Sequence, residues 1–100
     1  MERKRPNMPI TFQIPAYLAA FAEGQRSLKI DSSPATVNDA LSALWRLHPG
    51  LRDRILDEQG QVRQHINVFV GEESIRFGDG LATKVPAGSE IVIVPAVSGG

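Results

Sequence analysis

TVNDALSALWRLHPG, residues 36–50, carries the strongest helix signal in the chain. Thr36 and Asp39 have the spacing of a capping box, with Asp in place of the usual Glu or Gln. Apolar residues then recur at the spacing of one helical face: Val37, Ala40, Leu41, Leu44 and Trp45. Because Pro49 disfavours helical geometry in the residue before it, we expect the helix to end near His48. Trp45 falls on the apolar face, which predicts core packing rather than ligand stacking.

Two strands are predicted before this helix. Residues 10–14, ITFQI, alternate apolar and polar side chains, as in a strand with one buried face, and Pro15 ends the run. An apolar connection and a Glu-Gly turn signal at 23–24 follow, after which Leu28 and Ile30 again show a spacing of two. The opening section is therefore predicted to be a β-hairpin.

A short helical turn and a polar linker are predicted directly after the long helix. The apolar residues of the turn are Leu51, Ile55 and Leu56. The linker, 57–61, places Asp57 and Glu58 side by side. Two adjacent carboxylates resemble a catalytic pair, but a linker offers no enclosed pocket that would tune them for acid–base chemistry. We interpret them as part of a solvated turn.

The second half of the chain is predicted to add strands to the sheet. In the run INVFV, 66–70, alternate residues face opposite sides of a sheet. Turn signals at 71–74 and 78–80 lead to a final strand, Ile91–Val94. The order strand, strand, helix, strands leaves the helix able to cover only one face of the sheet. This order predicts an α+β domain.

The final strand is apolar on both of its sides. Ile91 and Ile93 alternate with Val92 and Val94, so the pair that faces away from the helix leaves hydrophobic side chains on the open face. Phe69 joins that patch if the register of its strand allows. The candidate docking surface for a partner is therefore Phe69, Val92 and Val94. The pattern fits equally well a central strand whose second face is covered by a loop.

Length and composition exclude several classes of protein. One hundred residues with 42% hydrophobic content fit a single domain. Eleven basic and eleven acidic side chains give no net attraction to nucleic acid or to an anionic membrane, and we expect neither as a partner. The absence of cysteine excludes a disulfide framework, a thiolate metal site, an iron–sulfur cluster and a cysteine nucleophile.

Residues 1–7 are predicted to form a disordered basic arm. Arg3, Lys4 and Arg5 are not followed by the apolar segment of a secretory signal. Nothing long enough to span a membrane follows them in the sequence. We therefore expect a cytoplasmic location.

The sequence predicts no catalytic site and no metal site. His48 and His65 are isolated in the sequence, whereas a metal site normally needs three or four protein ligands. No phosphate-binding loop of the GxxxxGK[ST] type is present, and 78–80 is interpreted as a turn rather than a nucleotide cradle. We expect the chain not to be an enzyme by itself and to bind no cofactor.

The candidate functional segment is the carboxyl-terminal tail, Ala96, Val97, Ser98, Gly99 and Gly100. Glycine lacks a Cβ, so a terminal Gly-Gly pair passes through a narrow channel in conformations that other residues resist. Fully extended, the tail reaches roughly 17 Å at about 3.3–3.6 Å per residue, enough to enter the active site of a partner. The alternative is an ordinary frayed chain end.

The segment 66–100, INVFVGEESIRFGDGLATKVPAGSEIVIVPAVSGG, resembles the small sulfur-carrier proteins of the MoaD/ThiS family. The most specific parts are IRFGDGLAT, 75–83, and VPAVSGG, 94–100, which are most similar to the carriers of bacterial cysteine biosynthesis. The opening strand and the capped helix agree with the same family over nearly the whole chain after Met8. One departure is Ser98, where related tails often have alanine.

This resemblance implies both a fold and a chemistry. The fold is a ubiquitin-like β-grasp over 8–95, with a mixed sheet covered on one face by the main helix, followed by a flexible tail, 96–100. Residues 96–99 thread the active site of a ubiquitin-activating-type enzyme, which adenylates Gly100 with ATP and Mg²⁺. Activation is needed because a terminal carboxylate, with an ordinary pKa of about 3.3–3.7, is ionised at neutral pH and is a poor electrophile. Gly100 is then converted to a thiocarboxylate, which donates sulfide to a sulfur-accepting synthase. The free carrier is expected to be a monomer.

Two alternatives begin from the same family. A ubiquitin-like modifier would form an isopeptide bond between Gly100 and a lysine of another protein. A small subunit of molybdopterin synthase would keep its tail inserted in a larger catalytic subunit. For a carrier, the preferred client is cysteine formation or a related sulfur incorporation, but a thiazole, a molybdenum cofactor precursor, a thiolated transfer RNA or a secondary metabolite would accept sulfur from the same kind of donor.

Overall fold

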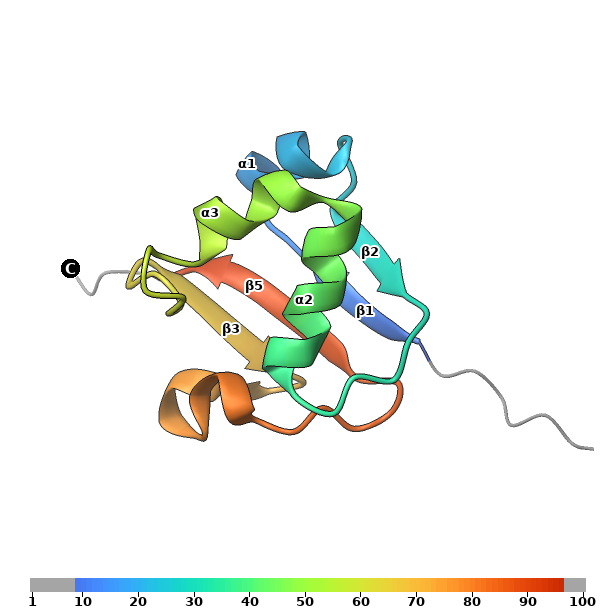
Figure 1. Ribbon diagram of the computed structural model, residues 1–100, viewed down its shortest axis with the longest axis vertical. Helices are drawn as coiled ribbons and strands as arrows, with labels where there is room; N and C mark the ends of the chain where they lie inside the picture. The colour runs from blue at the N-terminus through green and yellow to red at the C-terminus, as the bar shows by residue number, and fades with distance from the viewer. Residues whose placement is uncertain (1–8, 97–100) are drawn as a thin grey trace, which may run out of the picture.

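The sheet of the computed structural model, which describes residues 9–96, has five strands in the order β2-β1-β5-β3-β4 (Figure 1). The strands are β1 (Ile10–Gln13), β2 (Ser27–Ile30), β3 (Ile66–Val70), β4 (Glu73–Ser74) and β5 (Glu90–Pro95). The pair β1 and β5 is parallel, and the other pairs are antiparallel, so the predicted mixed sheet is confirmed. The predicted opening hairpin is also confirmed, with Ile10 opposite Ile30.

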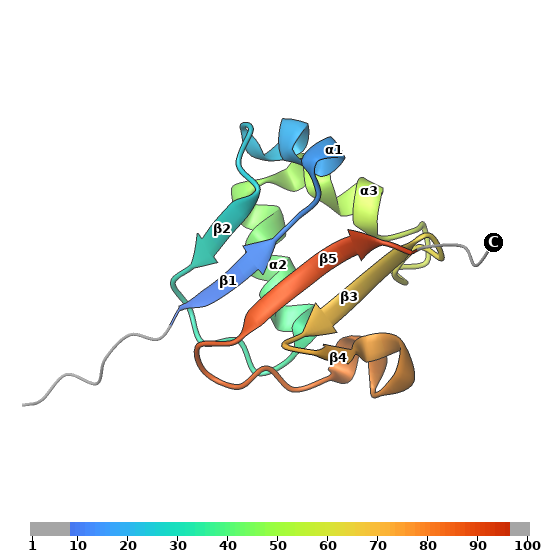
Figure 2. The same cartoon turned by 180° about the vertical axis from the view of Figure 1, so that it is seen from behind.

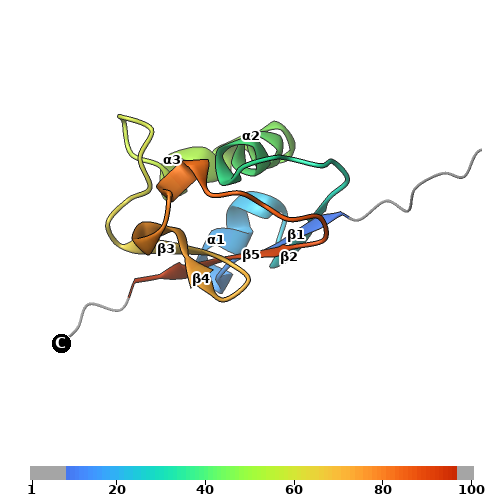
Figure 3. The ribbon, with the colours of Figure 1, turned by 90° about the horizontal axis from the view of Figure 1, so that it is seen from below.

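The main helices lie on one side of this sheet, as Figure 3 shows for α2 and α3. The α-helices are α1 (Ala16–Ala19), α2 (Val37–Leu47) and α3 (Arg52–Ile55). The 3-10 turns are η1 (Ala20–Ala22), η2 (Pro49–Leu51), η3 (Ile75–Phe77) and η4 (Gly80–Ala82). One sheet with helices on one face is the α+β arrangement that the sequence predicts.

Helix α2 begins and ends where its sequence signals predict. The Thr36 hydroxyl oxygen accepts a hydrogen bond from the Asp39 backbone N–H at 3.2 Å, which satisfies one free donor of the first turn. At the other end the His48 N–H donates to the Leu44 carbonyl at 2.8 Å, and Pro49 starts η2. Trp45 is half-buried and packs against the core, as predicted.

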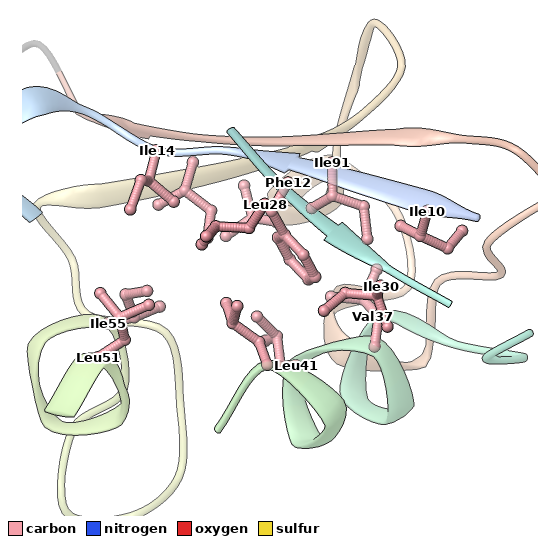
Figure 4. Packing of buried hydrophobic residues seen from close by; sticks show 14 of the residues in the cluster. Ile10, Phe12, Ile14, Leu28, Ile30, Val37, Leu41, Leu51, Ile55 and Ile91 are labelled. Atoms are coloured by element: carbon pink, nitrogen blue, oxygen red, sulfur yellow. The ribbon is translucent and has the colours of Figure 1, made fainter. Parts of the chain in front are cut away.

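The hydrophobic core lies between the sheet and the helix layer. Phe12 of β1 is 0% exposed and points from the sheet toward Leu41 of α2 (Figure 4). Leu51 and Ile55 close the core at the end of α2, and the neighbouring Leu56 is buried as well. These three residues confirm the predicted short helical turn after the long helix.

Two connections contain more regular structure than the sequence predicts. The apolar connection after β1 forms α1 and η1, because one helical turn places Leu18 and Ala22, each 0% exposed, on a single inward face. The predicted turn at 71–74 contains β4, which forms a tight hairpin with Val70 opposite Glu73. Gly71 has a φ of +62°, a conformation that glycine adopts without the steric cost of a Cβ.

Candidate functional site

The face of the sheet that turns away from the helices has an apolar centre. Phe69 of β3 lies opposite Val92 of β5, and Val94 follows two residues along β5, so these three side chains share one face. Ile91 and Ile93 point the other way and are only 0% and 1% exposed, whereas Val92 and Val94 are half-buried. We call Phe69, Val92 and Val94 the apolar sheet patch. Figure 2 shows this face toward the viewer, with the helices behind it.

The apolar sheet patch is not covered by a loop in the part of the chain that the structure describes (Figure 2). The alternative interpretation is a central strand whose second face is covered by a loop. Strand β5 is indeed central in the sheet, but its second face is open. Polar residues surround the patch on the side of β1 and β2, where Thr11 pairs with Lys29 and Gln13 with Ser27. The Gln13 amide donates to the Ser27 hydroxyl at 3.2 Å. An apolar centre with a polar border is the usual composition of a protein interface.

Arg76 fixes one border of the patch in a way that the sequence does not predict. Its Nε donates to Asn67 Oδ1 at 3.1 Å, and its Nη2 donates to the Ile66 carbonyl at 2.7 Å and to the Gln64 carbonyl at 3.5 Å. These bonds lie along the edge of β3 beyond its short pairing with β4. Because Oδ1 accepts from the arginine, the amide nitrogen of Asn67 remains a donor. No local sequence signal joins Arg76 to Asn67.

The tail leaves the domain beside the apolar sheet patch. The Ala96 N–H donates to the His65 carbonyl at 2.8 Å, which extends the pairing of β5 with β3 by one residue and fixes the root of the tail. A shallow hollow connects the patch to this root, lined by Gln13, Ile14, Pro15, Arg26, Val92, Ile93, Val94 and Pro95. The remaining predicted tail residues, 97–100, and the predicted arm, 1–7, lie outside the described residues.

The other candidate residues of the sequence lie in a turn, at a helix end and at the root of the tail. Asp57 Oδ1 accepts hydrogen bonds from the N–H groups of Gln59 and Gln61, both at 2.9 Å, which confirms the predicted turn. His48 ends α2, and the His65 carbonyl holds the tail root. Within residues 9–96, no three His, Cys, Asp or Glu side chains come together as a metal site would need. No helix in this range has the length and apolar character required to cross a membrane.

Comparison with known proteins identifies the family of this chain. The model of the ThiS family matches residues 12–100. The chain belongs to the ThiS family. A relative of this ThiS-family chain is the sulfur carrier protein CysO of Mycobacterium tuberculosis H37Rv, 34% identical over 95 residues that cover 93% of this chain and 100% of the relative. Another is small archaeal modifier protein 1 of Haloferax volcanii, 40% identical over 78 residues that cover 77% of this chain and 85% of the relative.

Solved structures of ThiS-family relatives confirm the ubiquitin-like β-grasp fold. The crystal structure of Mycobacterium tuberculosis CysO superimposes with a TM-score of 0.80 at 32% identity, covering 88% of this chain and 99% of that chain. A chain in the crystal structure of the Amycolatopsis orientalis BexX/CysO complex gives a TM-score of 0.79 at 33% identity, with coverages of 91% and 99%. The expectation of a ThiS-family β-grasp domain is therefore correct.

Proposed function

We propose that this chain is a sulfur carrier and that Gly100 carries the sulfur as a thiocarboxylate. The observation that carries the proposal is the extent of the family match, which continues to residue 100. The alignment with the sulfur carrier CysO likewise covers the whole of that relative. The structure supports a role for the carboxyl-terminal segment because the root of the tail, Ala96, lies at the edge of an open apolar face.

The proposed chemistry takes place on the terminal carboxylate in two steps. A carboxylate oxygen of Gly100 attacks the α-phosphorus of ATP, so that a P–O bond forms and pyrophosphate leaves. A sulfide donor then attacks the acyl carbon, and AMP leaves as the C–S bond forms. The chain supplies the carboxylate only, since its sequence has no phosphate-binding loop. ATP and Mg²⁺ therefore belong to an adenylating partner, and we place the reaction in the cytoplasm, where ATP is available.

The apolar sheet patch is the proposed docking surface for this adenylating enzyme. Phe69, Val92 and Val94 lie next to the hollow that leads to Ala96, so an enzyme seated on the patch would receive the tail directly. A few well-packed side chains near the centre of an interface contribute most of its binding free energy, and Phe69 is the aromatic candidate in this patch. Between encounters the free carrier is expected to be a monomer.

Replacing Val94 with lysine is expected to weaken activation of the carrier without unfolding it. A charge within the patch, at its end nearest the tail root, must be desolvated on docking, so the KM for the carrier in ATP–pyrophosphate exchange should rise about 10-fold or more. The matched control is Thr11→Lys, which adds the same charge on the same face but outside the patch, and it should change KM by less than about 2-fold. Equal KM values for the two variants, both folded by circular dichroism, would remove the patch from the docking surface.

The client of the carrier is proposed to be a separate sulfur-accepting enzyme, with cysteine formation or a related sulfur incorporation as its reaction. Support comes from the relative CysO of Amycolatopsis orientalis, which was crystallised in complex with BexX. The sulfur of the carrier would pass to the acceptor substrate, and water would attack the acyl carbon as the C–S bond breaks, which returns the Gly100 carboxylate.

A second function, protein modification, is favoured by one specific relative. Small archaeal modifier protein 1 of Haloferax volcanii is 40% identical to this chain. The adenylate of Gly100 would then react with a lysine amine of another protein, so that an amide bond forms and AMP leaves. Carrier and modifier share the first step, and only the product at Gly100 separates them.

A further inference from the structure

A second hollow lies at the root of the tail, on the helix side of the sheet. It is about 280 Å³ in volume and lies between α1–η1 and α3. Figures 1 and 2 both show α1 and α3 at the end of the sheet where β5 terminates. We call it the root hollow; its lining residues are Tyr17, Leu18, Phe21, Asp53, Arg54, Arg63 and His65. None of these residues belongs to the apolar sheet patch.

Two arginines of the root hollow are held in fixed positions. The guanidinium carbon of Arg54 lies 4.3 Å from the centre of the Phe21 ring, a stacking contact that leaves the N–H groups at its edge available. The Arg63 Nε donates to the backbone carbonyl of Asp53 at 3.0 Å, which leaves its two terminal nitrogens available. Both guanidinium groups are therefore oriented before any partner arrives.

Among the described residues, these two arginines have no carboxylate partner. Within residues 9–96, neither Arg54 nor Arg63 has a carboxylate within 4 Å. The acidic residue on the rim, Asp53, pairs instead with Arg52 at 3.1 Å. Guanidinium groups bind carboxylates through two parallel N–H···O bonds, which gives both strength and geometric specificity. The root hollow is therefore suited to an anionic oxygen ligand.

The position of the root hollow indicates where that ligand comes from. His65 lines the hollow and its carbonyl holds Ala96 at 2.8 Å, so an enzyme that encloses the tail must lie against the rim. In an extended tail Gly100 lies about 13–14 Å beyond Ala96 at about 3.3–3.6 Å per residue. ATP must be bound at Gly100, far from the hollow, so the anion that meets Arg54 and Arg63 belongs to the protein part of the partner.

From these observations we infer that the root hollow is a second contact for the adenylating enzyme and binds a carboxylate side chain that the enzyme presents beside the path of the tail. This inference rests on the proposed function. The enzyme then holds the root of the tail from two sides, by apolar contact on the open sheet face and by charge on the helix side. The charged contact orients the tail and speeds encounter, as complementary charges at an interface border do.

The test uses ATP–pyrophosphate exchange with the full chain and an adenylating enzyme that activates the wild type. The double variant Arg54→Glu/Arg63→Glu should raise the KM for the carrier roughly 10-fold at low salt and leave kcat unchanged. The wild-type KM should rise with ionic strength, because salt screens the charges, while the KM of the variant should not. The single variant Arg63→Glu should also raise KM, and its matched control is Lys84→Glu, which reverses one charge at the opposite end of α2 beside Thr36 and should leave KM unchanged.

The outcomes separate the two proposals. If the wild type is activated and the folded double variant shows the wild-type KM and salt dependence, the root hollow is not a contact and the proposed function stands. If no adenylating enzyme of a sulfur-carrier system activates the wild type, the proposed function itself fails. If the glutamate variant does not fold, the neutral variant Arg54→Gln/Arg63→Gln is measured instead. A wild-type KM for this glutamine variant would also contradict the inference.

Discussion

One alanine added after Gly100 is expected to abolish adenylation and to leave the stability of the domain unchanged. The reacting carboxylate would move by about 3.3–3.6 Å, the length of one extended residue, whereas misplacement of a reacting group by about 1 Å already costs on the order of 100-fold in rate. ATP–pyrophosphate exchange should therefore fall by about 100-fold or more. Thermal unfolding should not change, because the described core ends at Ile93 and the addition lies far beyond it.

Two variants of the tail complete this prediction. Deleting Gly100 shortens the reach by one residue and should abolish exchange in the same way. Ser98→Ala keeps the length of the tail and removes only a hydroxyl group, so it should remain active. An extended chain that exchanges at the wild-type rate, with its added alanine still present by mass spectrometry, would contradict the proposal that Gly100 is the reacting residue.

The substitution Phe12→Ala is expected to cost about 3–5 kcal/mol in the free energy of unfolding. Phe12 is 0% exposed and lies between the sheet and α2, so its removal leaves a cavity that the surrounding strands cannot close. A small domain has a total stability of about 5–15 kcal/mol, so this loss is a large part of the whole. Urea unfolding followed by circular dichroism measures it.

The control for Phe12→Ala is its neighbour Thr11, which points to the open face of the sheet. Thr11→Ala removes a small, half-exposed side chain and should cost less than about 1 kcal/mol. A cost below about 1 kcal/mol for Phe12→Ala as well would contradict the placement of this ring at the centre of the core.

Local sequence signals were sufficient to predict most of the fold. The bounds of α2 follow from Thr36 at its start and Pro49 at its end, both of which act within one helical turn. The alternation in 10–14 fixed which side of β1 is buried, because only one of its faces is apolar. These features depend on neighbouring residues and need no knowledge of the rest of the chain.

The open face of β5 was not predictable in the same way. Both of its faces are apolar, so the sequence alone does not distinguish Val92 from Ile91. The pairing of β5 with β3 decides which face is open, because it places Val92 opposite Phe69. More than twenty residues separate these two in the sequence. The register therefore decides that Phe69, Val92 and Val94 share the open face, and their role as a docking surface stays a prediction.

The arginine contacts were missed for a related reason. Arg76 and Asn67 are nine residues apart and lie in two different elements, and Arg54 and Phe21 come from segments still further apart in the sequence. Single arginines on a predicted surface carry no local signal of such contacts. The aromatic residue in the connection after β1 was visible in the sequence, but its partner was not.

The central claim is that Gly100 becomes a thiocarboxylate, and intact-protein mass spectrometry tests it directly. The chain is purified from a host that also expresses an adenylating enzyme active on it and is supplied with a sulfur source. The predicted result is a mass gain equal to one oxygen exchanged for one sulfur, located at Gly100 by fragmentation and absent when the chain carries the added alanine. An unmodified mass with an active adenylating enzyme, together with Gly100 joined to lysines of other proteins, would contradict the carrier function and assign the chain as a modifier.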